Sequence, residues 1–236
     1  MARVFDKNMF IMLLSIMIGA IIITYFVADI VSRTKWEVKE EGYKIEIKDI
    51  KGKSENFTSL FLKSNVLLDQ AREERAFGNY HFDLGFLWYN SALSERNSSI
   101  MEVYKFRGIE NCTFAMPFYI ASNEKFLEAK NYFNKTKKYT YINKYITMLD
   151  LYVNLTSSGS NLTNLRYNAC KYLVSLTENL TFNFETNKVV YLENVTEILL
   201  LFNVNMMAYN NEISNYQEIQ DEIDEYEFFD ENREIS

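Results

Sequence analysis

The chain has 236 residues, of which 48% are hydrophobic and 16% aromatic, so it can build a packed core and a largely disordered chain is excluded. One Pro and 7 Gly leave few helix breakers, which favours helices over a sandwich of short strands. The net charge of −7 arises in the acidic C-terminal end, and no cluster of basic residues indicates nucleic-acid binding. We therefore expect a mainly α-helical protein with no nucleic-acid partner.

The first element is an apolar segment without charged residues between Lys7 and Asp29. Its length is close to the roughly 20 residues that a helix needs to cross a bilayer. A cleaved signal peptide is the competing interpretation, but the apolar run exceeds the roughly 7–15 residues of such signals. Phe26 also stands where a signal peptidase needs a small residue. We expect a short cytoplasmic N-terminus at residues 1–7 and a single-pass signal-anchor at residues 8–30, in contact with the lipid bilayer.

Glycosylation sequons, Asn-x-Ser/Thr, occur only after this apolar segment. The basic residues that flank the anchor do not settle its orientation, so the sequons decide it. Seven are Asn-x-Thr, more than random placement of the Asn and Thr residues predicts, and helix caps or turns would enrich these residues without enriching their spacing. We expect the chain from about residue 33 onward to lie outside the cytoplasm as part of a cell-membrane glycoprotein. The candidate acceptors are Asn56, Asn97, Asn111, Asn134, Asn154, Asn161, Asn179 and Asn194.

Residues 154–163 read NLTSSGSNLT and begin and end with the same tripeptide. Ser and Gly are typical of linkers, so we interpret residues 157–160 as a connection between helices and the whole stretch as an exposed segment that a glycosyltransferase reaches.

Cys112 and Cys170 both fall in the domain that we expect outside the cytoplasm. An oxidising exterior permits a disulfide between them, and two separate buried thiols are an equally good interpretation. Cys112 also lies inside the sequon of Asn111, so a disulfide that forms early would impede glycosylation there.

The residues after the anchor predict a small β-element followed by helices. Residues 36–47 alternate apolar and polar side chains, which predicts a juxtamembrane β-hairpin at residues 33–50. An extracytoplasmic helical domain is expected at residues 56–226, and a disordered acidic tail at residues 227–236. Within that domain, helical periodicity predicts helices at 60–77, 82–96, 123–138, 141–153, 162–176 and from 192 onward.

The last of these helices has the strongest periodic signal. Its apolar residues follow a 3-4 spacing over more than three heptads, which indicates a helix of roughly 30 or more residues. The helix is either the spine of a helical bundle or a coiled-coil seam between two chains. We favour the spine, because Tyr and Phe fit a broad groove within one chain better than a tight dimer. The residues of the series are Leu192, Val195, Leu199, Phe202, Met206, Tyr209, Ile213 and Tyr216.

The stretch AREERAFGNYHFDLGFLWYNSAL, Ala71 to Leu93, resembles one tetratricopeptide-type helical hairpin. The likeness consists of the small Ala71, a turn at Gly78-Asn79-Tyr80, and Tyr89 and its successors closing a second helix. It covers about a tenth of the chain, its register slips by two residues, and no second copy follows. The resemblance implies stacked helical hairpins and protein binding, with no functional residue carried over.

No catalytic or metal-binding motif accompanies these elements. His81 is the single His, and no second His or nearby Cys completes a metal site. A Gly-rich phosphate loop, a nucleophile elbow and a Cys/His pair are not found in the sequence. We therefore expect no catalytic residue, no metal and no cofactor, and we do not expect an enzyme.

Three functional hypotheses follow. The first is a membrane-anchored, glycosylated helical protein that binds an unidentified protein partner or serves as surface structure. The second is a ligand-sensing or substrate-binding helical domain working with a membrane partner, which would need a deep aromatic pocket between helices. The third is an extracytoplasmic hydrolase, which would need two acidic groups facing each other across a cleft. We favour the first.

Overall fold

The computed structural model describes the backbone of residues 7–226 and the side chains of residues 47–226. The described elements are α1 (Lys7–Ser94), α2 (Ser98–Thr136), the short 3-10 helix η1 (Lys137–Tyr139), α3 (Asn143–Glu178), β1 (Leu180–Asn183), β2 (Lys188–Tyr191) and α4 (Thr196–Asp224). The chain divides into two compact units, Met1–Lys53 and Ser54–Ser236. We call the second unit the bundle. The expectation of a mainly α-helical protein with a helical bundle is confirmed.

The first unit contains the beginning of α1, whose backbone is helical from Lys7 onward. The predicted β-hairpin at residues 33–50 is therefore wrong. Lys and Glu fill most of its polar positions and favour a helix, and an isolated hairpin is marginal in water, so a helix that continues through the stretch is the better solution. The predicted anchor at residues 8–30 lies outside the residues whose side chains are described. Where side chains are described, no helix has the length and apolarity that a bilayer crossing needs.

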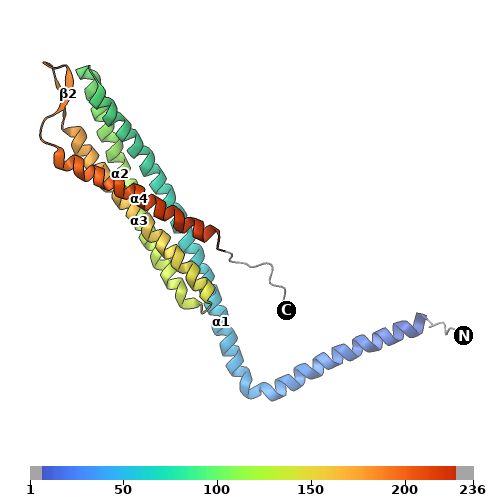
Figure 1. Cartoon of the computed structure of the whole chain (residues 1–236). Coiled ribbons are helices and arrows are strands. Elements are labelled where there is room, and N and C mark those ends of the chain that lie inside the picture. The colour runs from blue at the N-terminus through green and yellow to red at the C-terminus, as the bar shows by residue number, and fades with distance from the viewer. Residues whose placement is uncertain (1–6, 227–236) are drawn as a thin grey trace. The chain divides into compact units, whose positions relative to one another are not determined.

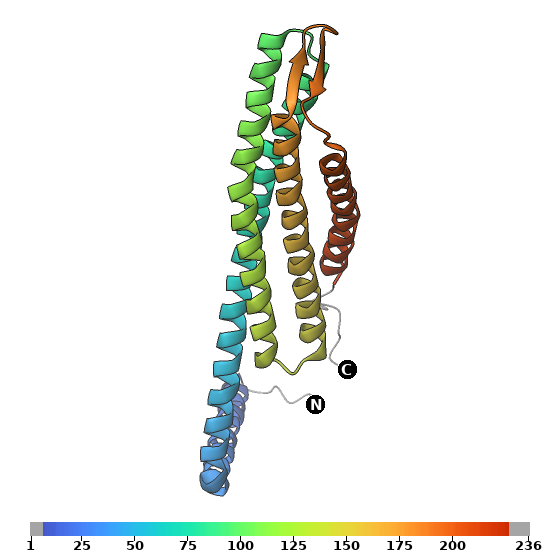
Figure 2. The ribbon, with the colours of Figure 1, turned by 90° about the vertical axis from the view of Figure 1, so that its left-hand side faces the viewer.

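The bundle consists of the later part of α1 together with α2, α3 and α4, which run side by side (Figures 1 and 2). The antiparallel strands β1 and β2 lie between α3 and α4 in the sequence and pair in the register Leu180 to Tyr191 through Asn183 to Lys188. They lie at the end of the bundle where α1 is joined to α2 (Figure 2). This hairpin was not predicted from the sequence.

The core of the bundle follows a heptad pattern in which small and large buried residues alternate. On α2 the small set recurs every seven residues, and the large set fills the positions between. Small residues on α1 and α2 allow the two backbones to come close, and Ser122 Oγ donates a hydrogen bond of 2.7 Å to the Ala71 carbonyl. The small set on α2 is Gly108, Ala115, Ser122, Ala129 and Thr136, and the large set is Tyr119, Phe126 and Phe133, with Cys112 at the equivalent position one heptad earlier.

The predicted helix break at Gly78-Asn79 is wrong, because α1 continues through it to Ser94. Gly78 serves packing instead: a Cβ atom there would lie 2.8 Å from the ring of Tyr119. The tetratricopeptide-like turn that was inferred at this position therefore does not exist. The helix predicted to begin at residue 123 likewise begins earlier, since α2 starts at Ser98 and includes Pro117.

The stretch NLTSSGSNLT is not a linker, because it lies inside α3. A Cβ atom on Gly159 would lie 2.4 Å from the buried Phe126 ring, so this ring can pack against α3 only because residue 159 has no side chain. The repeated tripeptides are seven residues apart, which is close to two helical turns, so their Leu and Thr residues occupy equivalent buried positions. The buried heptad positions of α3 are Leu155, Leu162, Ala169 and Leu176, and beside them Thr156, Thr163, Cys170 and Thr177.

A long C-terminal helix is present as α4, which has 29 residues and is therefore slightly shorter than predicted. It begins at Thr196, so Leu192, the first residue of the predicted series, lies before it and is exposed. It packs within the chain, as expected for a spine: Phe202 stacks on Phe86 of α1 at a centroid distance of 5.9 Å, and Tyr209 and Tyr216 are buried against the other helices. The predicted acidic tail at residues 227–236 lies outside the described residues.

Candidate functional site: an aromatic surface on α1 and α2

Five rings gather on the outer side of the α1–α2 pair. We call them the aromatic surface: Phe77, Tyr80 and His81 on α1, and Phe114 and Phe118 on α2. Phe77, Tyr80 and Phe114 are more than half exposed, at 51%, 60% and 56%. Large rings are normally buried, so exposed rings in mutual contact are the informative feature of this face.

His81 is the centre of this surface. Its ring lies 4.7 Å from that of Phe114 in a T-shaped contact and stacks on Phe118 at 5.9 Å, measured between centroids. Phe118 in turn stacks on Phe77 at 5.8 Å. A hydrogen bond of 3.3 Å between His81 Nδ1 and Asn111 Oδ1 fixes the imidazole. The rings therefore form one preorganised apolar area.

A shallow recess of about 530 Å³ opens on the α1 side of this surface and is lined by Glu73, Ala76, Phe77, Tyr80 and His81. Gly78, Phe82 and Gly85 of the same helix take the inward heptad positions, so Phe77, Tyr80 and His81 must point outward. The lining of the recess suits apolar side chains from another molecule.

Among the described residues, no group of His, Cys, Asp and Glu is arranged to hold a metal ion. The His81 ring contacts neighbouring aromatic rings and the amide of Asn111 instead.

The centre of the bundle is filled by a layer to which each helix contributes. Arg166 of α3 is only 11% exposed in its side chain and stacks on the rings of Tyr209 at 4.0 Å and Phe82 at 4.3 Å. Tyr119 Oη donates to Asn79 Oδ1 at 2.8 Å, and Asn79 Nδ2 donates to Tyr209 Oη at 3.3 Å. The aromatic pocket between helices required by the second functional hypothesis is occupied here by the chain's own side chains.

A second arginine–tyrosine layer follows one heptad away. Arg75 of α1 lies 4.4 Å over the ring of Tyr216, and Arg72 Nε donates to Tyr216 Oη at 2.9 Å. Cation–π contacts of desolvated guanidinium groups contribute about 2 kcal/mol each. Two such layers hold α4 against the remaining helices.

The environment of the core changes the acid–base properties of groups that lie in it. Desolvation raises the pKa of the Tyr119 hydroxyl far above its ordinary value. The hydrogen bond with Cys112, followed by burial, raises the pKa of the Cys170 thiol. The two cysteines are free and fully buried, as the interpretation of two buried thiols expects, and they lie in the same core cluster, which that interpretation did not include.

The sequon asparagines lie at or near the surface. Asn111 and Asn179 are half-buried, and the other six acceptors are exposed. At three sequons the Thr is fully buried and donates to the backbone four residues earlier, as at Thr156 to Tyr152 O, 2.9 Å. Residues two apart in a helix lie on opposite sides, so helix packing explains the Asn-x-Thr spacing at these three. They are the sequons of Asn134, Asn154 and Asn161.

The remaining sequons lack this explanation. At Asn56, Asn97 and Asn194 both the acceptor and the hydroxyl residue are exposed. Asn97 caps α2 by accepting from Ser99 N and Ile100 N through Oδ1, which leaves Nδ2, the atom that glycosylation modifies, free of those bonds. These three sequons are therefore the strongest support for a bundle that lies outside the cytoplasm.

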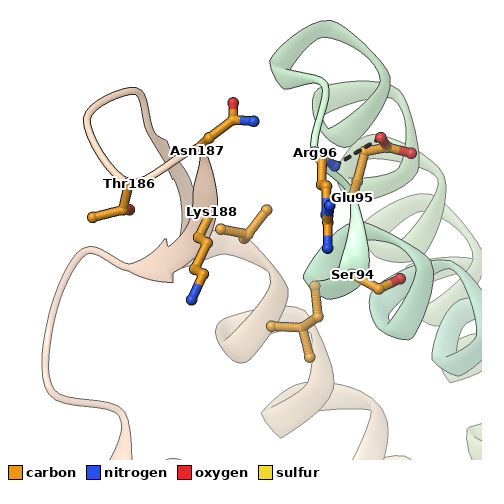
Figure 3. Close-up of a pocket in the computed structure, with 8 residues that line it drawn as sticks. Ser94, Glu95, Arg96, Thr186, Asn187 and Lys188 are labelled. Atoms are coloured by element: carbon orange, nitrogen blue, oxygen red, sulfur yellow. Dashed lines mark hydrogen bonds between the residues drawn. The ribbon is translucent and has the colours of Figure 1, made fainter.

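A second recess, of about 410 Å³, lies between the α1–α2 connection and the turn of the β-hairpin (Figure 3). Arg96 and Lys188 line it from the two sides, while Glu95 accepts hydrogen bonds from Arg96 N and Asn97 N at the start of α2. The Glu95 carboxylate thus accepts from backbone N–H groups, and the recess is lined by two basic residues and one acidic residue.

The aromatic surface and the half-buried arginines between the helices were not predicted from the sequence. In a continuous α1, Phe77, Tyr80 and His81 fall between the inward heptad positions, which predicts that their rings point outward. The sequence did not show this pattern, because a helix break was predicted at Gly78. Arginines are mostly exposed in proteins, so nothing in the sequence marked Arg75 and Arg166 as part of the helix packing.

No protein family model matches the chain, and no curated protein or solved structure matches it either.

Proposed function

We propose that the chain is a single-pass membrane protein whose glycosylated helical bundle lies outside the cytoplasm and binds a partner protein through the aromatic surface. The observation that carries the proposal is the group of exposed, mutually stacked rings around His81. Aromatic residues dominate the energetics of protein interfaces, and fixed rings bind with little loss of conformational entropy.

The chemistry of the recess indicates the kind of partner. Phe77 and Tyr80 form apolar walls, and Glu73 stands at the rim. A partner segment that inserts aliphatic or aromatic side chains, with a basic residue opposite Glu73, fits this lining. The membrane anchor supports the same function, because holding the bundle at a surface raises its effective concentration toward partners in that membrane.

The third hypothesis, a hydrolase, has less support. The glutamates that share a recess in the bundle, Glu212, Glu218 and Glu222, all belong to α4. Paired catalytic carboxylates must face each other across a substrate, and residues on one helix do not offer this.

Photo-crosslinking tests the proposal. A photoreactive benzoylphenylalanine replaces Phe114 in the full-length protein in its own membrane, and the matched control carries the same group at Phe184, which is 78% exposed on the β-hairpin turn. We expect a discrete crosslinked partner from position 114 and none from position 184. The Tyr80→Glu substitution should abolish the crosslink. Equal crosslinking from both positions would refute a specific surface.

A further inference from the structure

A polar groove runs between α3 and α4, with a volume of about 520 Å³. Asn154, Ser158 and Asn161 line it from α3, and Glu212, Glu218 and Glu222 from α4. On each helix these residues flank the buried heptad positions, so the groove follows directly from the packing of the two helices.

Ser158 has an unusual environment in this groove. The residue is 3% exposed, and its Oγ has no hydrogen-bond partner. The neighbouring hydroxyls are satisfied: Ser157 donates to the Val153 carbonyl at 2.7 Å, and Ser160 donates to Asn123 Oδ1 at 2.5 Å. A buried hydroxyl without a partner is costly, so Ser158 is a vacant hydrogen-bonding position for a group that enters the groove.

The charge of the groove indicates the sign of that group. Three glutamates line the groove, and no Lys or Arg does. Within residues 47–226, no ion pair joins Glu212, Glu218 or Glu222 to a basic residue. This lining suits a cation that donates hydrogen bonds to carboxylate and hydroxyl oxygens.

The spacing of the glutamates indicates which kind of cation fits the groove. At a helical rise of 1.5 Å per residue, Glu212 and Glu218 are separated by about 9 Å along α4, and Glu218 and Glu222 by about 6 Å. Apolar side chains, Leu151 and Ile219, also line the groove. We propose that the α3–α4 groove binds a linear aliphatic polyamine, whose ammonium groups meet the carboxylates and whose methylene segments lie on the apolar residues.

The groove is separate from the aromatic surface. A polyamine can enter it only when two of the sequon asparagines carry no glycan. Asn154 and Asn161 line the groove, so a glycan on either one would obstruct it. Polyamine binding is therefore a property of chains that are bare at these two asparagines.

Calorimetry on the full-length protein in a nonionic detergent, produced in a host that adds no N-glycans, tests the inference with spermidine as the probe. We expect one saturable site whose affinity falls with added salt. Glu218→Gln should weaken binding at least about threefold, whereas Glu178→Gln, which removes an exposed charge at the end of α3, should leave it unchanged. Butylamine and Mg²⁺ at equal ionic strength should bind much more weakly.

Ser158→Ala separates a ligand contact from a structural role. Removing the unpartnered hydroxyl should raise the melting temperature of the free protein and at the same time weaken spermidine binding several-fold. Should this variant not fold, Glu222→Gln takes its place. The inference is overturned if Glu178→Gln and Glu218→Gln weaken binding equally, if Mg²⁺ binds as well as spermidine, or if no saturable binding occurs.

Discussion

Cys170 on α3 and Cys112 on α2 lie in the same core cluster, where both side chains are fully buried. The two residues are 58 positions apart in the sequence, and Gly85 of α1 leaves room for the Cys112 sulfur, which a Cβ atom at that glycine would approach to 2.3 Å. We propose that these thiols form a disulfide in an oxidising exterior.

Oxidised glutathione provides the test of this disulfide. Each bridge would consume one molecule of the oxidant and release two of reduced glutathione. Closing this loop should stabilise the bundle by up to about 4 kcal/mol. We expect the refolded, oxidised chain to have no titratable thiol after denaturation and to melt at a higher temperature than the Cys112→Ser variant. Two titratable thiols after refolding would contradict the proposal.

A substitution at Gly159 tests whether NLTSSGSNLT packs as a helix. In Gly159→Ala the new methyl group would lie 2.4 Å from the buried Phe126 ring, so we expect a loss of about 1–3 kcal/mol in the free energy of unfolding. Gly52→Ala is the matched control, since its Cβ meets nothing within 4 Å, and it should be stabilising by about 0.5–1 kcal/mol. Urea unfolding measures both. If Gly159→Ala behaved like the control, the stretch would be a linker.

The contact between Arg166 and Tyr209 should account for much of the attachment of α4. Tyr209→Leu removes the ring beneath the guanidinium and should cost about 2–3 kcal/mol. Tyr209→Phe keeps the ring and loses only the bond from Asn79, so its cost should be about 1 kcal/mol or less. Hydrogen exchange should show faster opening of α4 in the leucine variant. Equal effects of the two variants would show that the ring contact contributes little.

Alkaline pH should destabilise the bundle through Tyr119. Burial raises the pKa of this hydroxyl, so the folded state retains the proton after the unfolded state has lost it. This stabilisation is complete below the ordinary pKa of 10.0 and is lost progressively above it. We expect Tyr119→Phe to cost about 1 kcal/mol at pH 7, through loss of the bond to Asn79, and to reduce the difference between unfolding free energies at about pH 7 and pH 10.5. An unchanged difference would contradict this role.

The fold can be predicted from the sequence where large residues occupy the inward heptad positions of a helix, and not where glycines occupy them. In α4, Phe202, Tyr209 and Tyr216 repeat every seven residues, so both the helix and its inward face are predictable. In α1 and α3 the inward positions include Gly78 and Gly159, and from the sequence a glycine that admits a neighbouring ring looks like one that makes a turn.

The same ambiguity affects the candidate sites. Thr136, Thr156 and Thr163 are buried helix residues opposite exposed asparagines, so part of the sequon pattern also serves packing. The aromatic surface depends on α1 and α2 lying side by side, a relation between residues more than 30 positions apart that local patterns do not contain.

The position of the bundle outside the cytoplasm is the central claim, and labelling of intact cells with a membrane-impermeant amine reagent tests it most directly. Lys138, Lys171 and Lys188 are exposed on the bundle and serve as the reporters. We predict that all three are modified in intact cells to the same extent as after lysis. Modification of these lysines only after the membrane is opened would contradict the account.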